Sequence, residues 1–389
     1  MTRVLSLFSG CGGLDIGFEG GFDLPYSIIL QGRKTRRIPK TGFQTVFAND
    51  VLETAKIAWE SYFNRKETFV VESIVDLVKK HNMGVFTFPE ADIVTGGFPC
   101  QDFSLAGNRM GFKSKKSHNS DSSLEYSDPT TENRGMLYFW MKEVISIVKP
   151  KIFVAENVKG LESLKDVKAT IERDFSSVDH GYIVKACTLN AGDFGVPQNR
   201  ERVIFIGLSK KLLSDTEIKV LEDESFSFFP EKPYDVKNKR INTVWHAIGK
   251  LPEPERSDDK SHQKYSGAKW YGKHCQGNIE IKLNGLAPTI RSEHHGNIEF
   301  RRLSKSNGGT VSSEYHLPQR RLSIRECARL QSFPDSCQFV QKGISATAGY
   351  KLVGNAVPPL LGFFIASKVQ ELYEKVYKPK QYINKEITS

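Results

Sequence analysis

Cysteine is scarce in this sequence, and its cysteines are never closely paired. Six of them are scattered through 389 residues with no Cys-x-x-Cys motif; they stand at positions 11, 100, 187, 275, 327 and 337. This spacing argues against a disulfide scaffold and against a cysteine-rich zinc site, and it predicts free thiols in a reducing cytosol. Long apolar runs are absent as well, so we expect a cytoplasmic protein with neither a membrane span nor a signal sequence.

Positive charge is the main bias in the composition. The net charge is +10, and residues 260–329 alone hold 13 Lys and Arg against 5 Asp and Glu. Aromatic and histidine side chains lie among these charges: Tyr265, Trp270, Tyr271, His294 and His295. Such a pattern suits a polyanionic partner such as nucleic acid. A solvated, lysine-rich surface is the alternative that charge alone leaves open.

Short apolar runs alternate with helical patterns through the first half of the chain. Strands are predicted at 4–8, 45–48, 69–71, 92–95, 152–155, 183–189 and 202–208, and helices at 51–63, 74–80 and 135–148. This alternation is typical of an α/β fold with a doubly wound, mostly parallel sheet and helices on both faces. Ligands bind such sheets beyond the carboxyl ends of the strands. Cys100 and Glu156 each follow a predicted strand at that edge.

The regular alternation ends after residue 208. A linker is expected over 215–235, followed by a smaller, irregular, β-rich domain. We therefore divide the chain into 1–208, 209–343 and a C-terminal part, 344–389, whose helix at 358–377 packs back onto the first domain. Ser323 and Glu326 have the spacing of a capping box and predict a helix that begins at Ile324.

Two polar stretches interrupt the first domain. Residues 23–42 contain the basic run "GRKTRRIPK", which we interpret as a surface loop, with contact to phosphate as the alternative. Residues 112–134 are polar, rich in serine and aperiodic. Such composition predicts a mobile segment, and its position just after Cys100 suits a lid.

The stretch "LFSGCGGLDIGF" contains a glycine turn between a predicted strand and a helical pattern. Turns of this kind hold nucleotide-type cofactors. It is not the dinucleotide fingerprint, because Asp15 replaces the last glycine of GxGxxG. The second strand ends at Asn49 and Asp50, where a carboxylate would meet a ribose diol, so a nucleoside cofactor other than NAD is favoured. A tight turn with Asp15 as a helix cap is the structural alternative.

The stretch "TGGFPCQDFS" places Cys100 after two glycines and a proline, on a predicted turn that favours exposure of its thiol. A zinc deaminase would need Pro-Cys-x-x-Cys, but residue 103 is Phe, so a thiol nucleophile remains. Glu156 ends an apolar strand, and partial desolvation there raises the pKa of a carboxyl group and suits a proton donor. The alternative for Glu156 is an ordinary charge at a helix N-terminus.

Two arginines stand where a strand begins in "PQNRERVIFIGL". Arg200 and Arg202 alternate onto one face and could clamp an anion or a carbonyl group. Each of them alone is equally consistent with a structural role. Their grouping with Glu156 at one edge of the sheet favours a functional one.

Taken in order, these stretches resemble the DNA cytosine C5-methyltransferase family, bacterial restriction–modification type. The matching segments are "LFSGCGGLDIGF", "GGFPCQDFSLAG", "RGMLYFW", "VAENVKGL", "NAGDFGVPQNRERVIFIG", "RRLSIRECARLQSFPD" and "YKLVGNAVPP". They span nearly the whole chain except about residues 209–285. Pro-Cys-Gln, Glu-Asn-Val and Gln-x-Arg-x-Arg together are highly specific for that family.

The resemblance implies an S-adenosylmethionine-dependent methyltransferase fold and covalent catalysis on a flipped-out cytosine in duplex DNA. Cys100 would add to cytosine C6 while Glu156 acts at N3. Arg202 would hold the cytosine O2, and Arg200 would steady a closed loop or a phosphate. The second domain would recognise the target sequence through the major groove.

The resemblance also implies a set of residues that bind S-adenosylmethionine. By the family pattern these are Phe8, Gly10, Gly12, Asp50, Val51, Ser73, Ile74, Pro99, Leu137 and Asn355. Ser73 is a departure, because many relatives have an aspartate there that contacts the adenine amino group. A serine hydroxyl can still accept a hydrogen bond, so binding is expected to survive.

The expected partner is double-stranded DNA with a short recognition site, and the expected enzyme is a monomer. A cognate restriction endonuclease would act on the same site without forming a stable complex. An RNA-directed member of the same fold is disfavoured by the long basic region before Arg320. A non-catalytic DNA-binding protein is disfavoured by the complete set of Cys100, Glu156 and the two arginines. A nicotinamide-dependent dehydrogenase would explain neither Cys100 nor the basic second domain.

Overall fold

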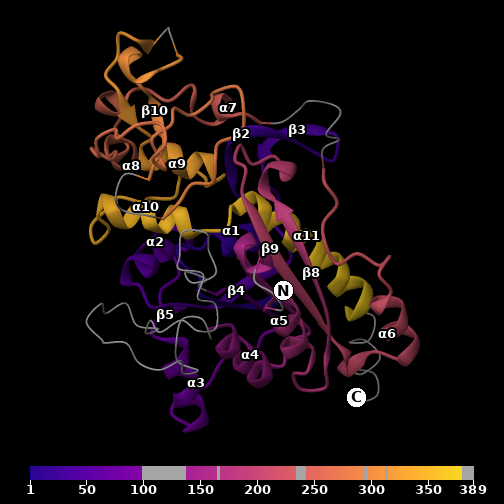
Figure 1. The fold of residues 1–389 in the computed structure, drawn as a ribbon. Coiled ribbons are helices and arrows are strands. Elements are labelled where there is room, and N and C mark those ends of the chain that lie inside the picture. Colours follow the sequence, from indigo (N-terminus) through magenta and orange to yellow (C-terminus); the bar gives the residue numbers. More distant parts are fainter. Residues whose placement is uncertain (99–136, 164–166, 234–241, 293–296, 312–313, 379–389) are drawn as a thin grey trace.

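The strands predicted in the first half of the sequence form one seven-stranded sheet (Figure 1). Its order is β5-β4-β1-β6-β7-β9-β8, with β1 (Thr2–Leu7), β4 (Phe43–Asp50), β5 (Phe69–Val71), β6 (Ile93–Gly97), β7 (Ile152–Val158), β8 (Tyr182–Asn190) and β9 (Glu201–Ser209). The pairs from β5 to β7 are parallel, and β9 runs antiparallel to both of its neighbours. The predicted α/β fold with a mostly parallel sheet is confirmed.

The computed structural model describes residues 1–98, 137–163, 167–233, 242–292, 297–311 and 314–378. Pro99, Cys100, the predicted lid at 112–134, and His294 and His295 lie outside the described residues.

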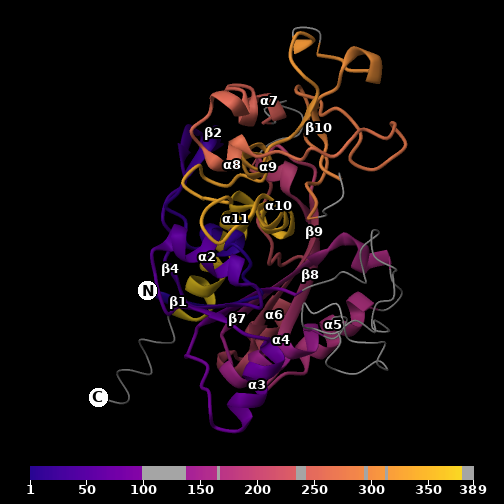
Figure 2. The same cartoon turned by 90° about the vertical axis from the view of Figure 1, so that its left-hand side faces the viewer.

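Helices cover both faces of the sheet, as a doubly wound fold requires (Figure 2). One apolar core unites one face with α1 (Gly13–Glu19), α2 (Glu53–Phe63) and α11 (Pro359–Val376). The other core unites the opposite face with α3 (Ile74–Asn82), α4 (Leu137–Val148) and α5 (Val167–Ser176). Helices α1 and α11 cross closely: a Cβ atom on Gly17 would lie 2.5 Å from the carbonyl oxygen of Pro359. Helix α11 therefore packs directly against α1.

Residues 23–37 form a β-hairpin, so the surface loop predicted within 23–42 is wrong. Strands β2 (Asp23–Leu30) and β3 (Arg33–Arg37) pair antiparallel. Leu24, Tyr26 and Ile28 alternate along β2 and are buried in the core, while the arginines of β3 are exposed. The period-two burial of β2 stabilises the hairpin, and the basic run occupies its outer strand.

The expected linker at 215–235 begins with a helix. Helix α6 (Asp215–Glu222) starts with a capping box between Ser214 and Glu217. The segment after it lies against β8, because Lys185 Nζ donates hydrogen bonds to the carbonyl oxygens of Asp223 (2.6 Å) and Phe226 (2.7 Å). The chain thus continues along the first domain beyond residue 208.

A second lobe lies above the sheet in Figure 1 and holds short elements joined by irregular chain. These elements are α7 (Val244–Ile248), η7 (Pro254–Arg256), α8 (Lys260–Gln263), β10 (Phe300–Arg302), η8 (Lys305–Asn307), β11 (Arg320–Arg321) and α9 (Ile324–Leu330). Helix α10 (Ala346–Asn355) joins this lobe to α11. The predicted capping box at Ser323 and Glu326 is confirmed. We call residues 242–330 the upper lobe; the domain boundaries at 208 and 343 stay predictions.

The basic stretch 260–329 presents less charge than its sequence suggests. Five of its arginines are buried: Arg301, Arg302, Arg320, Arg321 and Arg325. Glu253 accepts hydrogen bonds from Arg302 (2.9 Å) and Arg320 (3.0 Å), and Glu326 accepts another from Arg320 (2.8 Å). These arginines hold the upper lobe together, because a buried cation is tolerated only when it is paired and hydrogen-bonded.

One described segment departs from the expectation that no part of the chain could span a membrane. Ala346–Val376, which comprises α10 and α11, is long and apolar enough to cross a membrane by length and composition. However, 78% of its apolar window is buried inside the protein. Its apolar character is explained by its place in the core between the sheet and the upper lobe.

Candidate functional site

Most of the predicted site residues that the structure describes lie at the edge of the sheet where its parallel strands end. The register aligns Asp50 with Val71 and Leu7 with Gly96, and it aligns Gly97 with Glu156. The strand order places most of the expected cofactor residues at or just after the ends of β5, β4 and β1, and the expected base-contacting residues on β7 and around the start of β9. Strand β6 lies between the two groups, and the chain leads from it toward Cys100.

Asp50 anchors the glycine turn that follows β1. Its carboxylate accepts hydrogen bonds from the backbone N–H of Gly10 (3.0 Å) and of Leu52 (3.1 Å). Burial raises the pKa of Asp50, and the N–H groups of Gly10, Leu52 and Val51 oppose that rise. Each carboxylate oxygen can accept more than one hydrogen bond, so the group can hold the turn and still accept from a diol.

The turn itself requires glycine at two positions. Gly10 and Gly12 have φ angles of +53° and +82°, and Phe8 also has a positive φ of 52°. A Cβ atom on Gly12 would lie 2.7 Å from the Trp59 ring, whereas one on Gly10 would meet no described residue within 4 Å. The backbone at Gly10 therefore borders open space, as a cofactor cradle needs.

Asp15 is not the helix cap that the structural alternative suggested. Helix α1 has Gly12 at its N-cap and no side-chain cap. The buried carboxylate of Asp15 accepts hydrogen bonds from Ser6 Oγ (2.6 Å) and Trp59 Nε1 (2.7 Å). Burial raises the pKa of Asp15 to about 6, against the effect of these two donors. Asp15 thus ties β1 and α2 to the helix that follows the glycine turn.

The other expected cofactor residues differ in their surroundings. Ser73 caps α3, since its Oγ accepts a hydrogen bond from Val75 N (3.3 Å). Ile74 and Leu137 are buried, whereas Val51 is 40% exposed and Asn355, the last residue of α10, is also exposed. An exposed apolar residue directly after Asp50 is available to cover a flat ring.

Glu156 and Arg202 form a buried ion pair, which brings together two residues that are 46 positions apart. Arg202 Nε lies 2.8 Å from Glu156 Oε1. Burial raises the pKa of Glu156, and the charges of Arg202 and Arg200 oppose that rise. The raised pKa expected from the sequence is thereby confirmed in direction.

Gly97 and Asn157 adjoin this pair and were not predicted as site residues. A Cβ atom on Gly97 would lie 2.9 Å from Glu156 Oε2, so only glycine leaves room for the carboxylate. Asn157 Nδ2 donates a hydrogen bond to the carbonyl oxygen of Phe98 (3.4 Å), the last described residue before Cys100. The glycine pair in "TGGFPC" and the asparagine in "AENV" are the sequence features that could have indicated these two site residues.

Arg200 is fully buried and contacts backbone carbonyl groups. Its guanidinium donates hydrogen bonds to the carbonyl oxygens of Ile290 (2.9 Å), Gly354 (2.8 Å) and Ala356 (2.8 Å). Burial lowers its pKa strongly; Arg202 lowers it further, and Glu156 opposes this. Arg200 thus binds carbonyl groups, but these belong to the protein's own backbone. In this conformation its side chain is not exposed to a phosphate.

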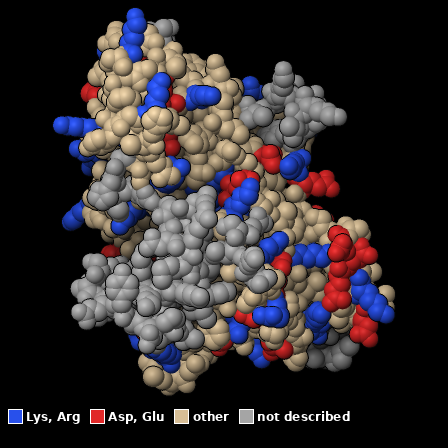
Figure 3. Space-filling model, in the orientation of Figure 1, with Lys and Arg blue, Asp and Glu red and all other residues tan. Residues whose placement is uncertain are grey.

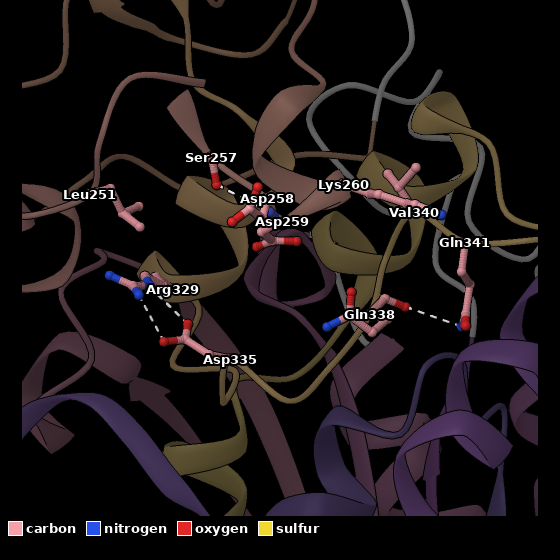
Figure 4. A pocket seen from close by; sticks show the side chains of 10 residues that line it. All are labelled: Leu251, Ser257, Asp258, Asp259, Lys260, Arg329, Asp335, Gln338, Val340 and Gln341. Atoms are coloured by element: carbon pink, nitrogen blue, oxygen red, sulfur yellow. Dashed lines mark hydrogen bonds and ion pairs between the residues drawn. The ribbon is translucent and has the colours of Figure 1, made fainter. Parts of the chain in front are cut away.

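A cavity of about 550 Å³ lies apart from the predicted site residues (Figure 4). Its lining includes Asp258, Asp259, Arg329 and Asp335, and Arg329 forms a bidentate pair with Asp335. Asp259 instead accepts hydrogen bonds from Ser261 N and Arg325 Nε, which lie outside the lining. Across the described ranges, no cluster of three or more His, Cys, Asp or Glu side chains is arranged to hold a metal ion.

The exposed cations of the upper lobe are mainly lysines. In Figure 3, Lys and Arg side chains are scattered over the visible face of that lobe, with few Asp or Glu among them. The exposed lysines of the basic stretch are Lys260, Lys264, Lys269, Lys273, Lys282 and Lys305. Tyr271, which is 69% exposed, lies in the same part of the sequence.

Comparison with known proteins gives concordant results. The family model for C-5 cytosine-specific DNA methylase matches residues 2–371. The chain is 30% identical to Type II methyltransferase M.FnuDI from Fusobacterium nucleatum, over 99% of this chain and 98% of the relative. It is 32% identical to Type II methyltransferase M.BspRI from Lysinibacillus sphaericus, over 95% and 81% of the two chains.

Solved structures of similar fold include two at low sequence identity. The Entamoeba histolytica methyltransferase EhMeth matches with a TM-score of 0.59 at 15% identity, over 97% of this chain and 99% of that one. The S. pombe Dnmt2 methyltransferase matches with a TM-score of 0.57 at 16% identity, over 97% and 100%. At such identities the likeness supports the fold alone.

Proposed function

Because the chain belongs to the C-5 cytosine-specific DNA methylase family, we propose that it transfers a methyl group from S-adenosylmethionine to C5 of a flipped-out cytosine in duplex DNA. The reaction proceeds through a covalent bond between Cys100 and cytosine C6. The enzyme protects host DNA within a restriction–modification system and works in the cytoplasm as a monomer.

Residues at and after the ends of β4, β1 and β5 suit the cofactor. The open backbone at Gly10 and the buried Asp50 carboxylate, 3.0 Å from Gly10 N, offer a cradle and an acceptor for ribose hydroxyl groups. Val51 would cover the adenine, with Phe8, Gly12, Ser73, Ile74, Pro99, Leu137 and Asn355 completing the site. When bound, S-adenosylmethionine supplies an electrophilic methyl group.

Residues on β7 and β9 suit the cytosine. Burial favours the protonated form of Glu156, so its carboxyl group can donate a proton or hydrogen bond to N3 of the base. Arg202 holds that carboxyl group at 2.8 Å and would also bind the cytosine O2. Arg200, whose guanidinium donates hydrogen bonds to three backbone carbonyl groups, would keep the edge of the site rigid.

Cys100 is the proposed nucleophile. It follows Gly97 by three residues, and an extended chain spans at most about 3.6 Å per residue, so the thiol can approach the Glu156 pair. That cluster holds one carboxyl group and two arginines, and its net positive charge favours a thiolate.

The proposed reaction has two covalent stages. The Cys100 thiolate adds to C6 while N3 gains a proton or hydrogen bond from Glu156, and the C5=C6 electron pair becomes that of an enamine. C5 would then bond to the methyl carbon of bound S-adenosylmethionine as the S–CH3 bond breaks, and the sulfur would keep that electron pair and leave as the neutral thioether. Loss of the C5 proton to a base and departure of the Cys100 thiolate restore the aromatic ring.

The position of β6 carries this proposal. It stands between the cofactor side and the Glu156 side of one sheet edge, and the segment with Cys100 follows it directly. A thiol in that segment would reach C6 of a base held at Glu156 while C5 of the same base faces the methyl donor, as methyl transfer requires. The exposed lysines of the upper lobe would contact DNA phosphates while its loops read the target sequence.

Bisulfite sequencing of DNA from cells that express this chain tests the proposal. We expect protected cytosines confined to one short sequence motif, and none in cells that express Cys100→Ser. DNA without protected cytosines, in the presence of folded protein, would contradict it. Methylation found only in RNA would contradict the substrate.

A further inference from the structure

Gln198 is completely buried at the point where the chain enters β9. Its Oε1 accepts a hydrogen bond from the backbone N–H of Ile290 (2.8 Å). Its Nε2 donates to Gln331 Oε1 (3.1 Å) and to the carbonyl oxygen of Leu330 (3.3 Å). This one side chain therefore joins the entry of β9 to Ile290, 92 positions further along the chain, and to Leu330 and Gln331, 132 and 133 positions further along, at the end of α9.

Backbone hydrogen bonds also join the entry of β9 to the segment of the upper lobe that contains Ile290. Residues 197–199 form a parallel bridge with Ala287, whose N–H donates to the carbonyl oxygen of Pro197 (3.0 Å) and whose carbonyl accepts from Asn199 N (2.8 Å). Thr289 Oγ1 donates to the carbonyl oxygen of Asn199 (2.7 Å). Segment 287–290 of the upper lobe is thus fixed to the entry of a strand of the central sheet.

That strand carries half of the ion pair assigned to the cytosine. Arg202 lies four residues after Gln198 and pairs with Glu156 at 2.8 Å. Between them, Arg200 donates to the carbonyl oxygen of Ile290 (2.9 Å). The end of α10 also packs closely against the upper lobe at this point. A Cβ atom on Gly354 would lie 2.3 Å from the carbonyl group of Arg291. The junction is too closely packed to slide without breaking these contacts.

We infer that Gln198 is a positioning residue that fixes segment 287–291 of the upper lobe in register with the Glu156–Arg202 pair. It thereby determines how strictly the enzyme discriminates its recognition site from sites that differ by one base pair. The inference rests on the proposed function, since it assumes that the upper lobe reads DNA while the pair binds the cytosine.

A merely structural role makes a different prediction. If Gln198 only stabilised the fold, its loss would lower the fraction of active enzyme, and kcat per total protein would fall while KM for DNA and site discrimination stayed constant. A positioning role changes KM and discrimination in the folded enzyme. The ratio between cognate and one-base-variant sites therefore separates the two.

The test compares Gln198→Met with Gln198→Glu, once the recognition site is known. Methionine keeps the volume but removes both kinds of hydrogen bond. We expect about a tenfold loss of discrimination and about a tenfold rise in KM for DNA, because a lost buried hydrogen bond shifts an equilibrium by about that factor. The kcat at saturating cognate DNA should change less than about threefold, and calorimetric affinity for S-adenosylmethionine should stay constant.

The glutamate variant adds a pH signature. Its carboxyl group has a raised pKa when buried, and the protonated form can accept from Ile290 N while donating to Leu330 or Gln331. The ionised form would face the Leu330 carbonyl and Gln331 Oε1, two acceptors. Discrimination by Gln198→Glu should therefore recover severalfold toward wild type as pH falls from 8.5 to 5.5, while that of Gln198→Met should not.

Gln263→Ala is the matched control, since this exposed glutamine of the upper lobe donates only to the nearby carbonyl of Ser257. Thr289→Val covers the case in which neither Gln198 variant folds; it removes one junction hydrogen bond near the surface and should give a smaller loss of discrimination. Wild-type discrimination and KM in folded Gln198→Met, or in Thr289→Val if it alone folds, would overturn the inference. Absence of methylation by the wild type would instead refute the proposed function.

Discussion

Replacing Gly97 by alanine tests the geometry of the base-contacting side most specifically. Gly97 on β6 faces Glu156 on β7, and an added Cβ atom would lie 2.9 Å from Glu156 Oε2. Ordinary contacts of this kind begin at 3.4 Å, so the carboxyl group must withdraw by about 0.5 Å. The φ angle of Gly97 is not positive, so alanine causes no backbone strain of its own.

The shift should slow chemistry without weakening cofactor binding. Displacing a proton donor by a fraction of an ångström costs about 1.4 to 2.7 kcal/mol of activation free energy, which corresponds to a 10- to 100-fold lower rate. Asp50 lies on β4, two strands away from β6, and should not feel the change. Affinity for S-adenosylmethionine should therefore remain that of the wild type.

Single-turnover transfer of a radiolabelled methyl group to duplex DNA measures the rate. Gly267→Ala is the matched control, because a Cβ atom there meets nothing within 4 Å and its φ angle is not positive. A folded Gly97→Ala enzyme with the wild-type single-turnover rate would refute the reasoning that the Glu156 carboxyl group must stay where the structure places it.

Two further predictions concern other parts of the molecule. Asp50→Asn should weaken the affinity for S-adenosylmethionine, measured by calorimetry, about tenfold or more, because an amide nitrogen would face the N–H of Gly10 or Leu52. Asp258→Asn, on the exposed side of the upper lobe, is the control. Unchanged affinity in Asp50→Asn would contradict the assignment of Asp50 to the cofactor. Burial alone would raise the pKa of Glu253, but its hydrogen bonds with Arg302 and Arg320 lower it to about 2. Since the pKa is lower in the folded state, the pair stabilises the fold above pH 4.5, and this stability is lost as pH falls toward 2. Denaturation of Glu253→Gln should therefore show a loss on the order of 1 to 3 kcal/mol at pH 7 that shrinks between pH 4.5 and 2; a loss that is equal at both ends would contradict the ionic origin.

The central sheet follows from the sequence because its strands are apolar runs with clear ends. Strand β5 occupies the predicted residues 69–71. The other strands of the sheet extend the predictions by one to three residues at one or both ends, whereas β1 stops one residue early, at Leu7, and β6 starts one residue late, at Ile93. Those added residues are partly polar, such as Asn49, Asp50 and Glu156, and are held by pairing with a neighbouring strand. Local composition does not reveal such pairing.

The hairpin at 23–42 and helix α6 were missed for different reasons. In β2 the alternation of Leu24, Tyr26 and Ile28 was present, but Pro25 and the basic run of β3 obscured it. In α6 the capping box of Ser214 and Glu217 was a usable signal, of the same kind that correctly placed α9 at Ser323. Only the first of these two omissions required knowledge of the tertiary structure.

The positions of site residues at strand ends could be predicted from the sequence. Their contacts with residues far away in the chain could not. Glu156 and Arg202 could be placed at one edge from the strand pattern alone. The burial of Arg200 could not, because its partners are the carbonyl groups of Ile290, Gly354 and Ala356, which lie 90 or more positions away. The same holds for the charge of residues 260–329, since five of those arginines are buried.

The most direct measurement concerns the bond between Cys100 and the base. Duplex DNA with 5-fluorocytosine at the target position is incubated with enzyme and S-adenosylmethionine, and the products are mapped by peptide mass spectrometry. Fluorine at C5 cannot leave as a proton does, so the adduct should persist and lie on the peptide that contains Cys100. Recovery of only free protein, or an adduct on another residue, would contradict the account.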